Sequence, residues 1–204
     1  MKGKFITLEG IEGSGKSTNL ESIKSVLDQK KIEYVITREP GGGPLGSHLR
    51  KLLLDKEQSI SPSVEMLLMM ADRKDHVDNL INPNLNKGIC VISDRYLDST
   101  IAYQGGGRQL DTDLINSLSV TLKLPTPDLT LLFDLPVDVA LQRAAERSEL
   151  DRFEREPKDF HSRIRYSYLE LASNNHRIKT VDSSKDAKLV SKQVEKYLSE
   201  FLNA

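Results

Sequence analysis

The fold of this chain is decided by the stretch Gly10-Ile11-Glu12-Gly13-Ser14-Gly15-Lys16-Ser17. The apolar run 5–8 before it predicts a short buried strand, and residues 19–27 after it carry apolar side chains at helical spacing. Strand, glycine-rich turn and helix together form the context in which the pattern G-x-x-x-x-G-K-S/T binds phosphate. An ordinary glycine-rich turn is the alternative, but both flanking elements fit, so we expect a nucleoside triphosphate to bind here.

The residue types in this loop have physical reasons. Glycines allow consecutive backbone N–H groups to turn inward and form an anion-binding nest at the start of a helix. Lys16 supplies a positive charge for the β- and γ-phosphates, and the Ser17 hydroxyl is a ligand for Mg²⁺. The residues expected to hold the triphosphate are Gly10, Ile11, Glu12, Gly13, Ser14, Gly15, Lys16, Ser17 and Thr18.

Composition narrows the class of protein. A length of 204 residues suits one domain with a sizeable core, and we expect 1–204 to form a single domain. A net charge of −1 argues against a dedicated nucleic-acid binder. No apolar run reaches membrane-spanning length, and no secretion signal is present, so we expect no membrane contact. The lone cysteine, Cys90, rules out a disulfide framework within the chain and favours the cytoplasm.

Short apolar runs predict five strands, at 5–8, 34–37, 89–92, 129–135 and 178–181. Helical segments are expected between them, including a long one over 64–85 and one from 97 to 103 that the stretch Gln104-Gly105-Gly106-Gly107-Arg108 interrupts. This alternation predicts an α/β fold with a five-stranded parallel sheet covered by helices on both faces. Ligands bind at the carboxyl ends of such strands, so Arg38, Asp94 and the phosphate loop should converge.

Asp94 and Arg95 end the third predicted strand. A carboxylate at this place in a chain with a phosphate loop favours a second Mg²⁺ ligand over a helix cap, so Asp94 and Ser17 are the expected metal ligands. Arg95 beside it favours a bound phosphate. The alternative for Arg95 is a structural salt bridge with Asp94 or Glu39.

Further motifs then point to a family. They are Thr37-Arg38-Glu39-Pro40-Gly41-Gly42, Asp94-Arg95-Tyr96-Leu97-Asp98-Ser99-Thr100-Ile101-Ala102-Tyr103-Gln104-Gly105, Pro127-Asp128-Leu129-Thr130 and Leu150-Asp151-Arg152. With the phosphate loop they span nearly the whole chain, and in this order the chain resembles the thymidylate kinases. The resemblance implies a P-loop NTPase fold, a homodimer, and transfer of the ATP γ-phosphoryl group to dTMP, with Mg²⁺, giving dTDP for dTTP synthesis.

The resemblance also implies roles for single residues. Arg38 and Arg95 would hold the acceptor phosphate, and Arg73 would donate to the 4-carbonyl of thymine. Apart from the resemblance, the sequence places an acid, Asp72, beside Arg73, where it is able to fix the guanidinium. The remaining acceptor-site residues are Ser99 and Gln104 at the base, Tyr103 beneath the deoxyribose, Glu12 near the reacting phosphates and the 3′-hydroxyl, and Met69 where the family usually has a phenylalanine that stacks on the base. Methionine predicts a usable but looser base slot.

Residues 146–159 mix basic and acidic side chains. By itself this mixture fits a solvated helical face and not a nucleic-acid stripe. The resemblance implies a closing lid of the bacterial type, because the phosphate loop contains no arginine and the lid contains several. Arg147 and Arg152 are the candidates, Arg147 being preferred. The expected catalytic residues are Lys16, Glu12, Arg95, Arg147 and Arg152.

Two other functions compete with this interpretation. A deoxynucleoside kinase would phosphorylate a hydroxyl and would need a base such as Glu12 near it. The phosphate-seeking Arg38 argues against that acceptor. A nucleotide-dependent switch protein would share the phosphate loop, but the chain has no Asn-Lys-x-Asp run for reading guanine.

Overall fold

Five parallel strands form the centre of the computed structural model, which describes residues 3–147 and 150–203. The strands are β1 (Phe5–Glu9), β2 (Tyr34–Arg38), β3 (Cys90–Asp94), β4 (Leu129–Asp134) and β5 (Ile178–Asp182). Their order across the sheet is β2-β3-β1-β4-β5. The predicted α/β class and all five predicted strands are confirmed.

The strand register brings the carboxyl ends together. Leu8 of β1 lies opposite Asp94 of β3 and Leu131 of β4, and Arg38 of β2 lies opposite the same Asp94. The phosphate loop leaves the end of β1, the central strand. The convergence of Arg38, Asp94 and this loop, expected from the sequence, therefore follows directly from the pairing.

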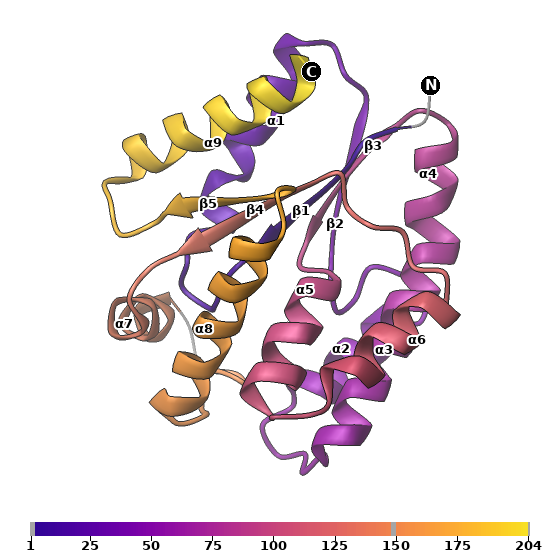
Figure 1. The fold of residues 1–204 in the computed structure, drawn as a ribbon, viewed down its shortest axis with the longest axis vertical. Coiled ribbons are helices and arrows are strands. Elements are labelled where there is room, and N and C mark those ends of the chain that lie inside the picture. Colours follow the sequence, from indigo (N-terminus) through magenta and orange to yellow (C-terminus); the bar gives the residue numbers. More distant parts are fainter. Residues whose placement is uncertain (1–2, 148–149, 204) are drawn as a thin grey trace.

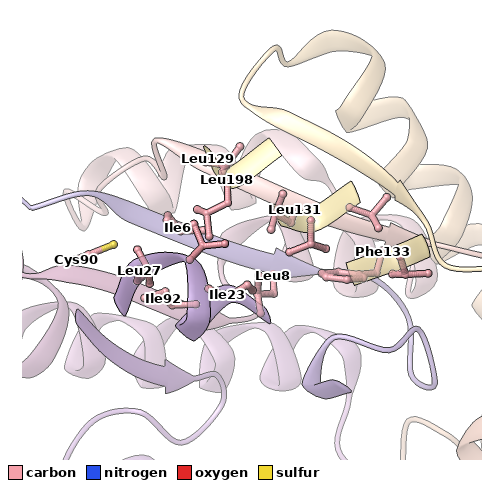
Figure 2. Packing of buried hydrophobic residues seen from close by; sticks show 14 residues of the cluster. Ile6, Leu8, Ile23, Leu27, Cys90, Ile92, Leu129, Leu131, Phe133 and Leu198 are labelled. Atoms are coloured by element: carbon pink, nitrogen blue, oxygen red, sulfur yellow. The ribbon is translucent and has the colours of Figure 1, made fainter. Parts of the chain in front are cut away.

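One face of the sheet is covered by α1 (Leu20–Gln29) and α9 (Ala187–Asn203), which lie side by side (Figure 1). Their apolar stripes pack on alternate residues of the central strands, and the free thiol of Cys90 is buried at the edge of the same cluster (Figure 2). The core residues labelled there are Ile6, Leu8, Ile23, Leu27, Cys90, Ile92, Leu129, Leu131, Phe133 and Leu198. This face mainly provides stability, and of its two helices only α9 reaches the site, through Ala187 and Val190.

The opposite face of the sheet is covered by the larger number of helices (Figure 1). They are α3 (Pro62–His76), η2 (Val77–Ile81), α4 (Asn82–Asn86), α5 (Leu97–Thr100), η3 (Ile101–Gly107) and α8 (Lys158–Asn174), with α2 (Gly46–Leu54) and α6 (Thr112–Thr121) beside α3 and η3 and with α7 (Val137–Arg147) against α8. The expected helix over 64–85 is one continuous helical segment in which η2 is a π-helical turn.

A 3₁₀ turn, η1 (Ser17–Asn19), joins the phosphate loop to α1.

The expectation that the glycine-rich stretch 104–108 interrupts its helix is wrong. α5 continues as the π-helical η3 through Gly107. Gly107 is buried against α8, where a Cβ would lie 2.6 Å from Cε2 of Phe160. Glycine is therefore required here for close packing and not for a turn. Within the described residues, no helix combines the length and apolar character needed to cross a bilayer.

Candidate active site

A cavity of about 760 Å³ opens at the carboxyl ends of the strands. Among the residues expected from the sequence, those that line it are Glu12, Gly13, Ser14, Gly15, Lys16, Ser17, Thr18, Arg38, Met69, Arg73, Asp94, Arg95, Ser99, Tyr103, Gln104 and Arg147. Gly10, Ile11 and Arg152 are the expected site residues that do not line it. The loop for a triphosphate and the arginines for a second phosphate therefore share one space.

The phosphate loop is closed around the Lys16 side chain. Lys16 Nζ donates to the carbonyl oxygens of Gly10 (2.9 Å) and Ile11 (3.1 Å) and to Oγ of Ser14 (3.2 Å). Burial lowers the pKa of Lys16 to about 8, and the positive charge of Arg95 acts in the same direction. The negative charge of a bound triphosphate would offset both the burial and the repulsion from Arg95, so the buried ammonium group of Lys16 favours an anionic ligand.

The Arg95 backbone adopts a left-handed conformation with φ 74°, which is rare for a residue with a side chain. Three hydrogen bonds hold it there. Its N–H donates to Leu8 O (2.9 Å), its carbonyl accepts from Ser93 Oγ (2.8 Å), and the next N–H, of Tyr96, donates to Glu9 Oε1 (2.8 Å). Such over-determined strain is typical of functional positions.

The Arg95 guanidinium points into a polar cluster. Nη2 donates to Glu12 Oε1 (2.9 Å) and to the Tyr103 hydroxyl (3.0 Å), and Nη1 donates to Ser99 Oγ (3.2 Å). The structural salt bridge considered from the sequence therefore exists, but with Glu12 and not with Asp94 or Glu39. Tyr103 also donates to Glu12 Oε1 at 2.6 Å.

Glu12 is held as an anion. Burial by itself would raise the pKa of Glu12, but the positive charges of Arg95 and Lys16 outweigh it and keep that pKa below its usual value. A carboxylate in this state is a poor proton acceptor near neutral pH. This fits an orienting role for Glu12 and disfavours the base that a deoxynucleoside kinase would need.

Two carboxylate oxygens at the cavity have no hydrogen-bond partner among the described residues: Asp94 Oδ1 and Glu12 Oε2. Both are buried, so each needs a donor or a cation to offset its desolvation. The described residues contain no group of three His, Cys, Asp or Glu side chains able to hold a metal by themselves. Asp94 with the Ser17 hydroxyl nevertheless fits Mg²⁺, which binds through one or two protein oxygens and completes its shell with phosphate and water.

Arg73 is a buried guanidinium on α3, with 2% of its surface exposed. Nε donates to Glu39 Oε2 (2.7 Å), Nη1 to Thr100 Oγ1 (2.8 Å) and Nη2 to the carbonyl of Tyr96 (2.9 Å). The expectation that Asp72 fixes this group is wrong. Asp72 instead accepts from the Gly41 N–H at 3.1 Å, and Glu39 holds Arg73.

Sequence reasoning missed Glu9, the last residue of β1. Its fully buried carboxylate accepts from Ser99 Oγ (2.6 Å) and from the Tyr168 hydroxyl (3.0 Å), besides Tyr96 N–H. Burial raises the pKa of Glu9 to about 7, and the charge of Asp98 adds to the shift. The available signal was an acid at the end of an otherwise apolar strand.

The two lid arginines lie in different places. Arg147 lines the cavity, has 60% of its side chain exposed, and donates to Glu154 Oε1 at 2.9 Å. Arg152 lies outside the lining, where it donates to Leu53 O (2.9 Å) and to Glu65 Oε2 (2.6 Å). Of the expected lid segment 146–159, positions 148–149 lie outside the described residues.

Comparison with known proteins adds independent evidence. A family model described as "Thymidylate kinase" matches residues 8–194. A thymidylate kinase from Carboxydothermus hydrogenoformans is 47% identical over 199 residues, covering 97% of this chain and 98% of that protein. One from Nitrosomonas europaea is 46% identical over 186 residues, covering 90% and 86%. The crystal structure of thymidylate kinase from Ehrlichia chaffeensis matches with a TM-score of 0.77 at 33% identity, covering 98% of this chain and 99% of that one.

Proposed function

This chain belongs to the thymidylate kinase family and transfers the γ-phosphoryl group of ATP to dTMP, giving dTDP; we propose here how its residues do so. The observation that carries the proposal is the single cavity lined by both the phosphate loop and Arg38, Arg73 and Arg95. Donor and acceptor must meet in line for phosphoryl transfer, and one shared space allows it.

The donor site is the loop from Gly10 to Thr18. Its backbone N–H groups and the Lys16 ammonium bind the phosphates of ATP, and Lys16 exchanges its loop carbonyl partners for them. Gly10 and Ile11 contribute by shaping the loop beneath the lining. Mg²⁺, held by Ser17 and Asp94, would neutralise charge on the donor phosphates and leave the phosphoryl group more open to attack.

The acceptor site is built around arginines. Arg95 and the exposed Arg38 hold the dTMP phosphate, because a guanidinium pairs with two oxygens of a monoester at once. Arg73 donates to the 4-carbonyl of thymine, and Gln104 and Ser99 lie at the base. Met69 forms the wall on which the base packs. Tyr103 packs beneath the deoxyribose and is fixed there by Glu12.

The chemical step needs charge stabilisation more than proton transfer. A phosphate monoester has its second pKa at about 6, so the attacking oxygen of dTMP is already an anion near neutral pH. That oxygen bonds to the γ-phosphorus as the bond to the β-phosphate oxygen breaks, and ADP leaves. Lys16, Arg95 and Arg147 provide the fixed positive charge for this approach, and Glu12 orients Arg95 and Tyr103.

Arg147 is the lid cation in this proposal, and Arg152 has a supporting place. Arg147 already lines the cavity, and its partner Glu154 is its only hydrogen-bond acceptor among the described residues. Arg152 is bound on both sides by Leu53 and Glu65 away from the lining. Closure of the segment 146–159 would bring Arg147 to the transferring group and exclude water.

We also propose that the enzyme is a homodimer in the cytoplasm. Exposed apolar side chains on neighbouring helices support the dimer: Val64 and Leu67 on α3 and Leu114 on α6, which lie side by side (Figure 1). Light scattering tests the dimer, and a monomer mass at micromolar protein concentration would exclude it. The buried free thiol of Cys90 supports a reducing compartment.

An acceptor screen tests the assignment. ADP formation from ATP is followed with dTMP, dUMP, dCMP or thymidine as acceptor, and we expect turnover that depends on dTMP. Turnover with thymidine in its place would indicate a deoxynucleoside kinase. Hydrolysis that no acceptor changes would indicate a nucleotide switch.

A further inference from the structure

Glu65 on α3 is a carboxylate with no role in the mechanism above. Its side chain is fully buried and does not line the cavity. Four donors from three residues surround it. Oε1 accepts from Gln104 Nε2 (2.8 Å) and Arg108 Nε (3.2 Å), and Oε2 accepts from Arg108 Nη2 (3.1 Å) and Arg152 Nη1 (2.6 Å).

The contact with Gln104 fixes the direction of a carboxamide. A glutamine side chain has a donor end, Nε2, and an acceptor end, Oε1, whereas a carboxylate only accepts. Glu65 therefore binds the NH₂ end of Gln104 and leaves Oε1 for another partner. Gln104 lines the cavity, so the acceptor end is the one available to a ligand there.

The negative charge of Glu65 stabilises this orientation of the Gln104 carboxamide. The guanidinium groups of Arg108 and Arg152 both pair with the same carboxylate and offset the cost of burying it. Turning Gln104 over would place its carbonyl oxygen against that carboxylate, with two acceptors facing each other and no proton between them. A buried acceptor pair of this kind is strongly disfavoured.

We propose that Glu65 is a positioning residue for base specificity. By holding Nε2, it directs Oε1 of Gln104 at the base, so that the site takes a pyrimidine with N–H at ring position 3 and rejects one with an unprotonated nitrogen there. Thymine and uracil have that N–H, and cytosine does not. The inference rests on the proposed base site at Gln104 and adds the group that sets its hydrogen-bonding sense.

Glu65→Gln is the direct test. The new amide must turn its NH₂ either toward Gln104 Nε2 and Arg108 Nε or toward Arg108 Nη2 and Arg152 Nη1. The first choice opposes one charged donor and the second opposes two, so the NH₂ should face Gln104. Gln104 can then turn over and present Nε2 to the base.

The readout is the ratio of kcat/KM for dTMP to kcat/KM for dCMP. We expect Glu65→Gln to reduce this ratio about tenfold or more, since a site made for one hydrogen-bonding sense loses its discrimination when that sense is reversed. The same substitution in a Gln104→Met background should change the ratio less than about twofold, because no carboxamide remains to turn. A ratio unchanged by Glu65→Gln, or changed equally in both backgrounds, overturns the proposal.

Two further measurements keep the test decisive. If Glu65→Gln melts below the assay temperature, Gln104→Met alone must lower the ratio, and a ratio at the wild-type value overturns the inference. Glu65→Asp keeps the carboxylate and should retain more of the preference than Glu65→Gln. Failure of the proposed function is a separate result, because the unaltered enzyme would then show no turnover with dTMP at all.

Discussion

Arg95 keeps a backbone conformation that few residues with a side chain adopt, and its neighbours explain why. The carboxylate of Glu9 holds the following N–H and also binds the Ser99 and Tyr168 hydroxyls, both of which contact the Arg95 guanidinium. One buried acid therefore fixes the backbone and the side chain of the same arginine. This arrangement positions the arginine for a phosphate before any substrate arrives.

Glu9→Gln tests this anchor through the pH dependence of stability. Burial raises the pKa of Glu9 to about 7 from an ordinary 4.5, so the folded protein holds this proton more tightly than the unfolded chain does. The resulting contribution to the free energy of unfolding is full below pH 4.5 and is lost as pH rises through about 7. The stability difference between wild type and variant, measured by urea denaturation, should fall across that window. A difference that stays constant with pH would show that Glu9 does not titrate there.

Arg147→Ala tests the lid cation. An arginine that reaches the transferring phosphoryl group is worth about a thousandfold in turnover, so kcat should fall by that order. The affinity for dTMP, measured by calorimetry, should change little because Arg38 and Arg95 hold its phosphate. Lys158→Ala is the matched control: it removes another exposed charge of the lid segment, one that pairs with Asp138 and does not line the cavity. Unchanged turnover in Arg147→Ala would exclude the residue from the reaction.

Met69→Phe tests the base slot. Met69 is half-buried, lines the cavity and packs against the cluster that contains Tyr103 and Phe153. A phenylalanine ring would stack on thymine, and such aromatic pairs are worth about 0.5–1.5 kcal/mol beyond the area that they bury. We expect dTMP to bind several-fold more tightly in calorimetry, with ATP affinity unchanged. Weaker dTMP binding would mean that the pocket has been shaped around methionine.

At the scale of elements, η3 connects packing to the site. Gly107 ends this π-helical segment against Phe160 and Ile164 of α8, and Tyr103 and Gln104 lie earlier in the same segment. The absence of a side chain at Gly107 sets how closely η3 approaches α8. Because the segment is one helix, that approach also sets where Tyr103 and Gln104 lie relative to the cavity.

Gly107→Ala tests this connection. The added Cβ would lie 2.6 Å from Phe160 Cε2 and 3.0 Å from Ile164 Cγ1, so η3 must move outward. Overpacking of this kind costs about 1–3 kcal/mol in the free energy of unfolding. We also expect kcat/KM for dTMP to fall, measured beside thermal denaturation. Phe160→Leu in the same chain removes part of the ring and should restore some of both, whereas an unaffected single variant would contradict the argument.

Much of the fold could be predicted from local sequence, because the five apolar strands and the phosphate loop are marked by short patterns. The π-helical conformation of η3 could not be predicted, because a run of glycines is typical of a turn. Its helical packing depends on contact with Phe160, which lies more than fifty positions away in the sequence. The ion-pair partners considered for Arg95 and Arg73 from the sequence were wrong for the same reason. Arg95 pairs with Glu12 and Arg73 with Glu39, across sequence distances that no local pattern encodes. Glu9 and Glu65 were missed because a buried acid shows its purpose only through such distant partners.

Across the whole molecule, the parallel sheet brings together basic side chains that lie far apart in the sequence. The chain has a net charge of −1, yet basic side chains from several elements line one cavity: Lys16, Arg38, Arg50, Arg73, Arg95, Arg143, Arg147 and Lys185. Donor loop and acceptor arginines meet there because β1, β2 and β3 are neighbours that end at one edge. Two anionic nucleotides can approach only where such fixed cations offset their repulsion.

A crystal structure of the protein with thymidine monophosphate and a non-hydrolysable ATP analogue tests this arrangement most directly. We predict that the acceptor phosphate lies against Arg38 and Arg95 with thymine beside Arg73 and Gln104, and that the triphosphate lies on the loop from Gly10 to Thr18. Thymidine monophosphate bound elsewhere, with the space beside those arginines empty, would contradict the account.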